Sequence, residues 1–134
     1  KQELLQGKHN FTATTGNTFK IALYTSSATL GASTTAFSSS NEITNTSGTA
    51  YTSGGATLTS VTPVASSTTA LCDFADVSFS SATFTANGAL IYNSSATNAA
   101  VAAIAFGSDK TATNGTFTIQ FPAADASNAI IRLA

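Results

Sequence analysis

The sequence predicts an all-β domain, a β-sandwich or jelly-roll-like fold of about eight short strands. Three observations favour it: short runs in which large apolar side chains alternate with small ones, turn residues between these runs, and a helix signal confined to the first residues. The length of 134 residues leaves room for one domain. We expect an N-terminal arm or short helix over residues 1–10 and a single β domain over residues 11–134.

The first half of the chain contains one clear strand and one long irregular segment. Residues 1–6 are good helix formers, and Gly7 suits the end of a helix. Large and small side chains alternate over residues 19–24, which predicts a half-buried strand. Residues 25–56 are mostly Ser, Thr, Ala, Gly and Asn, and this composition predicts a long loop or extended arm with short strands.

Turn residues divide the rest of the chain into short strands. Gly54-Gly55 marks a turn before a strand that Pro63 ends or places at a sheet edge. Residues 69–79 form another strand region, and Asn87-Gly88 predicts a hairpin turn between two apolar runs.

The last third of the chain shows the most regular alternation. We expect a strand of small residues at 101–106 and a turn over the residues from Gly107 to Gly115. Phe117, Ile119 and Phe121 then face one side of a strand that Pro122 stops. Residues 130–133 are expected to form the final strand.

Composition restricts the partners of the chain. Only 8% of its residues are charged, and five basic residues nearly balance six acidic ones. A nucleic-acid-binding protein needs a basic patch to displace counterions, so we expect no nucleic-acid partner. The longest apolar run, residues 99–106, is far too short to span a bilayer, so we expect no membrane partner. With 18 serines and 24 threonines, the surface is either hydrated by hydroxyl groups or covered by neighbouring subunits.

Few residues have side chains suited to catalysis or metal binding. His9 is the only histidine and lies in an N-terminal segment that we expect to be mobile, whereas Cys72, the only cysteine, is expected to be a buried inert thiol. We therefore predict neither an enzyme nor a cofactor. Asp73 and Asp76 point to opposite faces of a regular strand, so they do not form a catalytic pair. A calcium site that uses Asp73, Asp76 or Asp109 stays open.

Several segments together resemble a family of small Ser/Thr/Ala-rich virion proteins of tailed bacteriophages, in particular marine phages and cyanophages. The resemblance covers most of the chain in order, but none of its segments is a catalytic signature. The segments that resemble this family are KQELLQG at residues 1–7, TFKIALYT at 18–25, YTSGGATL at 51–58, DFADV at 73–77, GALIYN at 88–93, FGSDK at 106–110 and NAIIR at 128–132.

The resemblance implies a structural protein of the virion, and we favour a capsid cement (decoration) protein on the outer surface of the shell. It would bridge neighbouring capsomers, with the major capsid protein or other virion subunits as partners and as a homo-oligomer on the particle. The residues expected to bind partners lie in the N-terminal arm, directly after it at Phe11, and in the 25–56 segment: Leu4, Leu5, His9, Phe11, Leu30, Phe37, Ile43 and Tyr51.

Alternative functions remain. One is a tail or tail-fibre component, and another is a self-assembling extracellular filament or adhesin subunit joined by strand exchange. A carbohydrate-binding module would need Tyr24, Tyr51 and Tyr92 exposed on one face.

Overall fold

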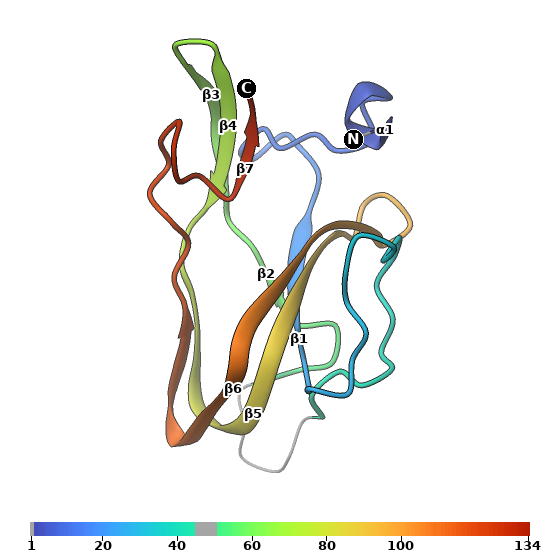
Figure 1. Cartoon of the computed structure of the whole chain (residues 1–134), viewed down its shortest axis with the longest axis vertical. Helices are drawn as coiled ribbons and strands as arrows, with labels where there is room; N and C mark the ends of the chain where they lie inside the picture. Colours follow the sequence, from blue (N-terminus) through green and yellow to red (C-terminus); the bar gives the residue numbers. More distant parts are fainter. Residues whose placement is uncertain (1, 45–50) are drawn as a thin grey trace.

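The computed structural model describes residues 2–44 and 51–134 of the chain. Within them, seven strands form two antiparallel sheets, and one short helix precedes the first strand (Figure 1). This confirms the predicted all-β, sandwich-like fold with a short helix at its start. The elements are α1 (Gln2–Leu5), β1 (Phe19–Tyr24), β2 (Ala56–Thr57), β3 (Ser60–Ser66), β4 (Thr69–Phe74), β5 (Val77–Asn93), β6 (Ala99–Ile119) and β7 (Ile131–Leu133).

The first sheet has the strand order β2-β1-β5-β6 and is dominated by the long hairpin of β5 and β6. Figure 1 shows this hairpin running down across the sheet and then turning upward toward the second sheet. Bulges bend and twist a strand pair, which explains how strands of 17 and 21 residues change direction without a loop. The register shifts lie between Phe79 and Ala82, Ala82 and Phe84, Ala86 and Gly88, and Ile91 and Tyr92.

The second sheet is a small three-stranded one with the order β3-β4-β7. A register shift between Val61 and Val64 places Pro63 in a bulge of the edge strand β3. This position suits proline because its nitrogen cannot donate to a ladder. Cys72 on β4 is free and buried, as expected, and its burial, together with the nearby Asp73 carboxylate, raises the pKa of its thiol to about 11.

The core between the sheets is rich in aromatic rings. Phe11 stacks on Phe19 with ring centroids 4.5 Å apart, and Phe19 contacts Phe74 at 5.7 Å. Further along the hairpin, Tyr51 packs against Phe79 at 5.5 Å. These contacts join the N-terminal segment, both sheets and the residues before β2 into one cluster.

The strand β1 is buried on both faces rather than half-buried. Its alternate face carries Ala22 and Tyr24, which form a second apolar cluster with Leu90 and Tyr92 of β5. Leu30 and Phe37 from the 25–56 segment pack against this cluster. The described part of that segment therefore folds back as a cover on the first sheet; residues 45–50 lie outside the described residues.

Two expected turns are wrong, because both fall inside long strands. Gly88 pairs with Tyr24 on one side and with Ala105 on the other, in the middle of the first sheet. A Cβ atom at this position would lie 2.8 Å from the carbonyl oxygen of Ile104, so the glycine permits a close approach of β5 and β6. Residues 107–115 likewise belong to β6, which bends there instead of ending. The hairpin therefore replaces several short strands with two long ones.

Candidate partner-binding surface

The helix α1 presents one of its two leucines to solvent. Leu4 is half-buried and packs against the core, whereas the side chain of Leu5 is 91% exposed. An isolated helix of this length has no stability of its own. The contacts of the residues that follow α1 therefore hold it in place.

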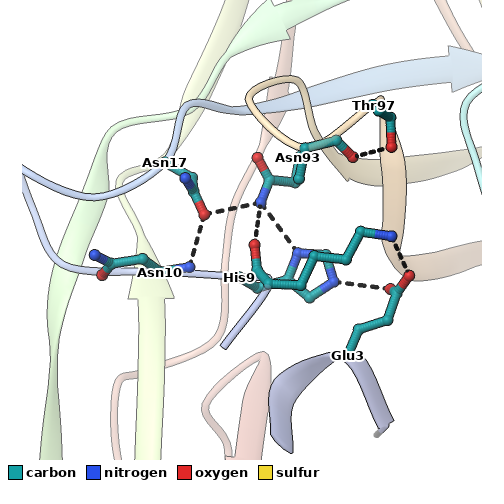
Figure 2. A network of polar contacts seen from close by, with 8 residues as sticks. Glu3, His9, Asn10, Asn17, Asn93 and Thr97 are labelled. Atoms are coloured by element: carbon teal, nitrogen blue, oxygen red, sulfur yellow. Dashed lines mark hydrogen bonds and ion pairs between the residues drawn. The ribbon is translucent and has the colours of Figure 1, made fainter. Parts of the chain in front are cut away.

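Asn93, at the end of β5, holds the N-terminal segment against the body (Figure 2). Its side chain is fully buried, and Nδ2 lies 3.2 Å from the Lys8 carbonyl oxygen, 3.1 Å from His9 Nδ1 and 3.0 Å from Asn17 Oδ1. Asn17 Oδ1 also accepts the backbone N–H of Asn10 at 2.8 Å. One amide thus fastens residues 8–17 to the first sheet.

His9 is a positioned side chain and not a mobile one, because its imidazole is only 4% exposed. Asn93 Oδ1 accepts the backbone N–H of Ser95, which orients the amide so that Nδ2 faces the histidine. An amide nitrogen donates, so the contact with Asn93 suits the tautomer in which His9 Nδ1 accepts and Nε2, 3.0 Å from Glu3 Oε2, carries a proton. Hydrogen bonds from Lys8 and then His9 lower the pKa of the Glu3 carboxyl. The histidine therefore connects α1 to β5.

Three of the residues selected from the sequence as partner-binding residues lie in the core. The side chains of Phe11 and Ile43 are buried, and Tyr51 is fully buried. Partner binding through these side chains is therefore corrected to a packing role. Large apolar residues in a polar segment gave the sequence signal, but that signal does not distinguish a covered residue from an exposed one.

Tyr51 belongs to a buried polar cluster around Glu42. Its hydroxyl donates to Glu42 Oε1 at 2.6 Å and accepts the backbone N–H of Leu23 at 2.9 Å. The hydroxyl of Ser53 and the backbone N–H of Gly54 also donate to the Glu42 carboxylate, at 2.8 and 2.7 Å. Burial raises the pKa of the Tyr51 phenol, and the hydrogen bond to Glu42 adds to this shift. The cluster fixes residues 51–54 to β1.

Leu30 and Phe37 are half-buried and lie over the first sheet. Phe37 stacks on Tyr92 with ring centroids 4.7 Å apart, and its backbone N–H bonds to the Asn98 carbonyl oxygen. Both side chains keep part of their surface open, so of the residues selected from the 25–56 segment these two remain candidates for partner contact.

The tyrosines do not form a sugar-binding platform. Tyr24, Tyr51 and Tyr92 are all buried, so the carbohydrate-binding alternative that required them exposed is wrong. Each hydroxyl instead fixes a loop: Tyr24 donates to the Ser38 carbonyl oxygen and Tyr92 to that of Gly54, both at 2.7 Å. Burial raises the pKa of Tyr24 to about 12.

The aspartates considered for calcium have separate surroundings. Asp76 accepts the backbone N–H of Phe121 at 2.9 Å, and Asp109 accepts the Asn87 amide at 2.8 Å. Asp73 Oδ1 is buried and has no hydrogen-bond partner in the described part of the chain. No group of three or more potential metal ligands occurs among residues 2–44 and 51–134.

A surface that the sequence indicated only in part lies at one end of the molecule, and we call it the apolar end. Its exposed side chains come from the second sheet and from α1, at the upper left and upper right of Figure 1: Leu5, Val61 (44% exposed), Val64 (54%) and Leu133 (53%). A shallow hollow of about 90 Å³ lies at this end, lined by Leu4, Pro63 and Leu133 among others. Two sequence signals fall here: Leu5, selected as a partner-binding residue, and Pro63, because proline in a strand marks an edge.

Comparisons with protein-family models, with curated proteins and with solved structures gave no match to this chain. Within the described residues, no helix has the length and apolar character needed to cross a membrane.

Proposed function

We propose that this chain is a structural protein of a tailed-bacteriophage virion, a cement protein on the outer surface of the capsid. Two lines of argument support the proposal. The segments that resemble phage virion proteins include the residues that build β1 and the last residues of β5, 88–93. The titratable side chains His9, Glu3 and Glu42 serve as hydrogen-bond partners that hold segments of the chain in place.

The observation that carries the proposal is the apolar end. A chain with few charges has four large apolar side chains exposed there, one on α1 and three on the second sheet. Large apolar side chains exposed at one end of a molecule favour protein contact at that end. A partner that covers this end would bury apolar surface at about 25 cal/mol per Å².

The mechanism would be mechanical. Each copy docks at equivalent positions on the shell and contacts neighbouring capsomers, the major capsid protein among them. Many weak contacts at fixed geometry raise the effective concentration of each binding surface, so total adhesion exceeds that of one contact. Every bridge then adds to the free energy needed to separate capsomers under internal DNA pressure.

Immunogold electron microscopy tests this proposal on purified particles of the phage that encodes the chain. We expect antibody against the chain to label intact heads over their whole surface. Label confined to tails would replace the cement role with that of a tail or tail-fibre component. Unlabelled particles, with the chain recovered as homopolymers, would favour the filament or adhesin alternative and reject the virion assignment.

Substitutions at the apolar end test which surface attaches. Leu5→Glu and Val64→Glu place a charge on side chains that are already exposed, so the fold should persist while occupancy of the particle falls. Ser26→Glu is the matched control because Ser26 is exposed on the 25–56 segment, away from this end. Occupancy that falls equally for Ser26→Glu and for the two apolar-end variants would contradict docking through the apolar end.

A further inference from the structure

A line of hollows separates the edge strands of the two sheets. β6 is the edge strand of the first sheet and β7 that of the second. A small hollow of about 80 Å³ is lined by Val101 of β6 and Ile131 of β7. A larger groove of about 530 Å³ lies further along β6, where the bend of this strand brings its two halves to face each other, and Ile130 just before β7 also lines it. We call this line of hollows the β6–β7 seam.

The larger groove is apolar and half-open. Its large apolar side chains are all only partly buried, although they pack against the core on their inner side. A groove of this size with aromatic and aliphatic walls is typical of a binding site. The residues concerned are Ile104, Phe106, Phe117, Ile119, Phe121 and Ile130.

The outer backbone edge of β6 makes few hydrogen bonds. In the described residues it is bonded only at its start, where Ala36 bridges Ala99 and the Ala100 N–H bonds to the Thr35 carbonyl oxygen. Beyond this point, residues 102–105 pair regularly with β5 on the inner side. A regular strand with an open edge is a template for one more strand.

The two edge strands of the second sheet carry features that disfavour pairing. Pro63 and its bulge interrupt β3. β7 carries Arg132, and antiparallel pairing of two copies about this residue would place like charges opposite each other. Residues 102–105 of β6 have neither proline nor charge. The open edge next to the groove is therefore the edge best suited to receive a strand.

The charge in the groove indicates the chemistry of the occupant. Lys110 lines the groove and is exposed, and its ammonium group bonds to the Ser108 hydroxyl at 3.1 Å. The ion pairs in the described part of the chain both involve Glu3, so Lys110 has no carboxylate partner there. A complementary occupant would bring a carboxylate to this point.

We propose that the seam receives an extended apolar segment from a neighbouring virion subunit of a different kind. The segment pairs with residues 102–105 of β6. Because side chains of a strand alternate between faces, every second residue would insert a large apolar side chain into the groove. A carboxylate of the segment lies beside Lys110. This inference rests on the proposed function, because it names how a partner subunit is held.

The test uses the whole chain, labelled with ¹⁵N, and a short synthetic peptide. In the peptide, isoleucine or valine alternates with threonine, and an aspartate stands at one end. We expect amide resonances of residues 102–106 and 117–121 to shift, and hydrogen exchange at residues 102–105 to slow. A peptide of the same composition with its apolar residues made consecutive serves as the control and should cause neither change.

Charge exchange tests the orientation of the segment. Lys110→Glu should weaken binding of the aspartate peptide about threefold, as expected for one exposed ion pair. It should restore binding to a peptide that ends in lysine. Lys20→Glu, which makes the same charge change on β1, is the matched control and should leave both affinities unchanged.

Several results would overturn the proposal. These are shifts confined to other residues, equal effects of both peptides, or no binding at millimolar peptide. If hydrogen exchange at residues 102–105 becomes slower as the protein concentration rises, without any peptide, the occupant is a second copy of this chain. Labelled particles with no peptide binding would reject the seam as a binding site and keep the cement role. Peptide binding together with unlabelled particles would keep the seam as a binding site and reject the cement role.

Discussion

At the scale of single residues, buried polar groups fix the irregular segments of this protein. Tyr51 is the clearest case, because its hydroxyl satisfies both the Glu42 carboxylate and the Leu23 N–H. Tyr51→Phe leaves the aromatic packing in place but removes both bonds. A buried group left without its partner costs about 1–3 kcal/mol, so the free energy of unfolding should fall by about this amount. Urea denaturation measures it.

Tyr92→Phe is the matched control for that change. It also removes one hydroxyl, but the bond lost is a single one to the Gly54 carbonyl oxygen, which is only partly buried. We expect a loss of about 0.5–1.5 kcal/mol. A Tyr51→Phe protein that is as stable as the parent would show that the Glu42 cluster does not hold residues 51–54.

Asn93 controls the attachment of the N-terminal segment. Asn93→Leu keeps the approximate volume but removes the amide that contacts Lys8, His9 and Asn17. We expect residues 2–17 to become sensitive to protease while β5 and β6 stay protected. Limited proteolysis with mass spectrometry measures this, and Gln120→Leu, which removes an exposed side-chain amide, is the control. Equal cleavage of both variants would contradict the anchoring role.

At the scale of elements, the approach of β5 to β6 at Gly88 sets the geometry of the first sheet. Gly88→Ala would place Cβ 2.8 Å from the Ile104 carbonyl oxygen, and backbone must move to relieve this contact. We expect a loss of about 1–3 kcal/mol in the free energy of unfolding, as for other overpacked sites. Thermal and urea denaturation measure the loss.

Gly31→Ala provides the comparison, because a Cβ there meets nothing within 4 Å. It should be neutral or raise stability slightly, since alanine restricts the unfolded chain. If Gly88→Ala behaves like Gly31→Ala, the glycine at position 88 does not serve close strand approach.

The sequence could predict strands but not where the longest ones continue. Alternation at Phe117, Ile119 and Phe121 predicts part of β6 because that face packs against the core. Asn87-Gly88 has the composition of a hairpin turn, yet neighbouring strands on both sides keep it extended. Long-range pairing decides such positions, and a local pattern holds no information about it.

The candidate surfaces were harder to predict for a related reason. Leu5, selected as a partner-binding residue, is exposed, whereas Tyr51 and Ile43 belong to the core. Val61, Val64 and Leu133 were missed because alternation along a strand does not tell which face the second sheet leaves uncovered. The seam depends on the bend of β6, which arises from bulges that the sequence does not reveal.

At the scale of the whole molecule, the buried phenols and the thiol make the fold sensitive to alkali. Burial raises the pKa of Tyr24 to about 12 and of Cys72 to about 11, and it also raises the pKa values of Tyr51 and Tyr92. Each group is neutral while protonated, so the folded protein keeps its proton to a higher pH than the unfolded chain does. The unfolded chain therefore binds fewer protons above the ordinary pKa values of 9.0 and 10.0.

Stability should consequently be independent of these groups below about pH 9 and fall as the pH rises toward 11 and 12. Urea denaturation at a series of pH values measures this slope. Tyr92→Phe should flatten the fall, because one titrating group is gone although the protein is less stable at neutral pH. A free energy of unfolding that stays constant or increases between pH 9 and 11 would show that the phenols and the thiol ionise as readily in the folded protein as in the unfolded chain.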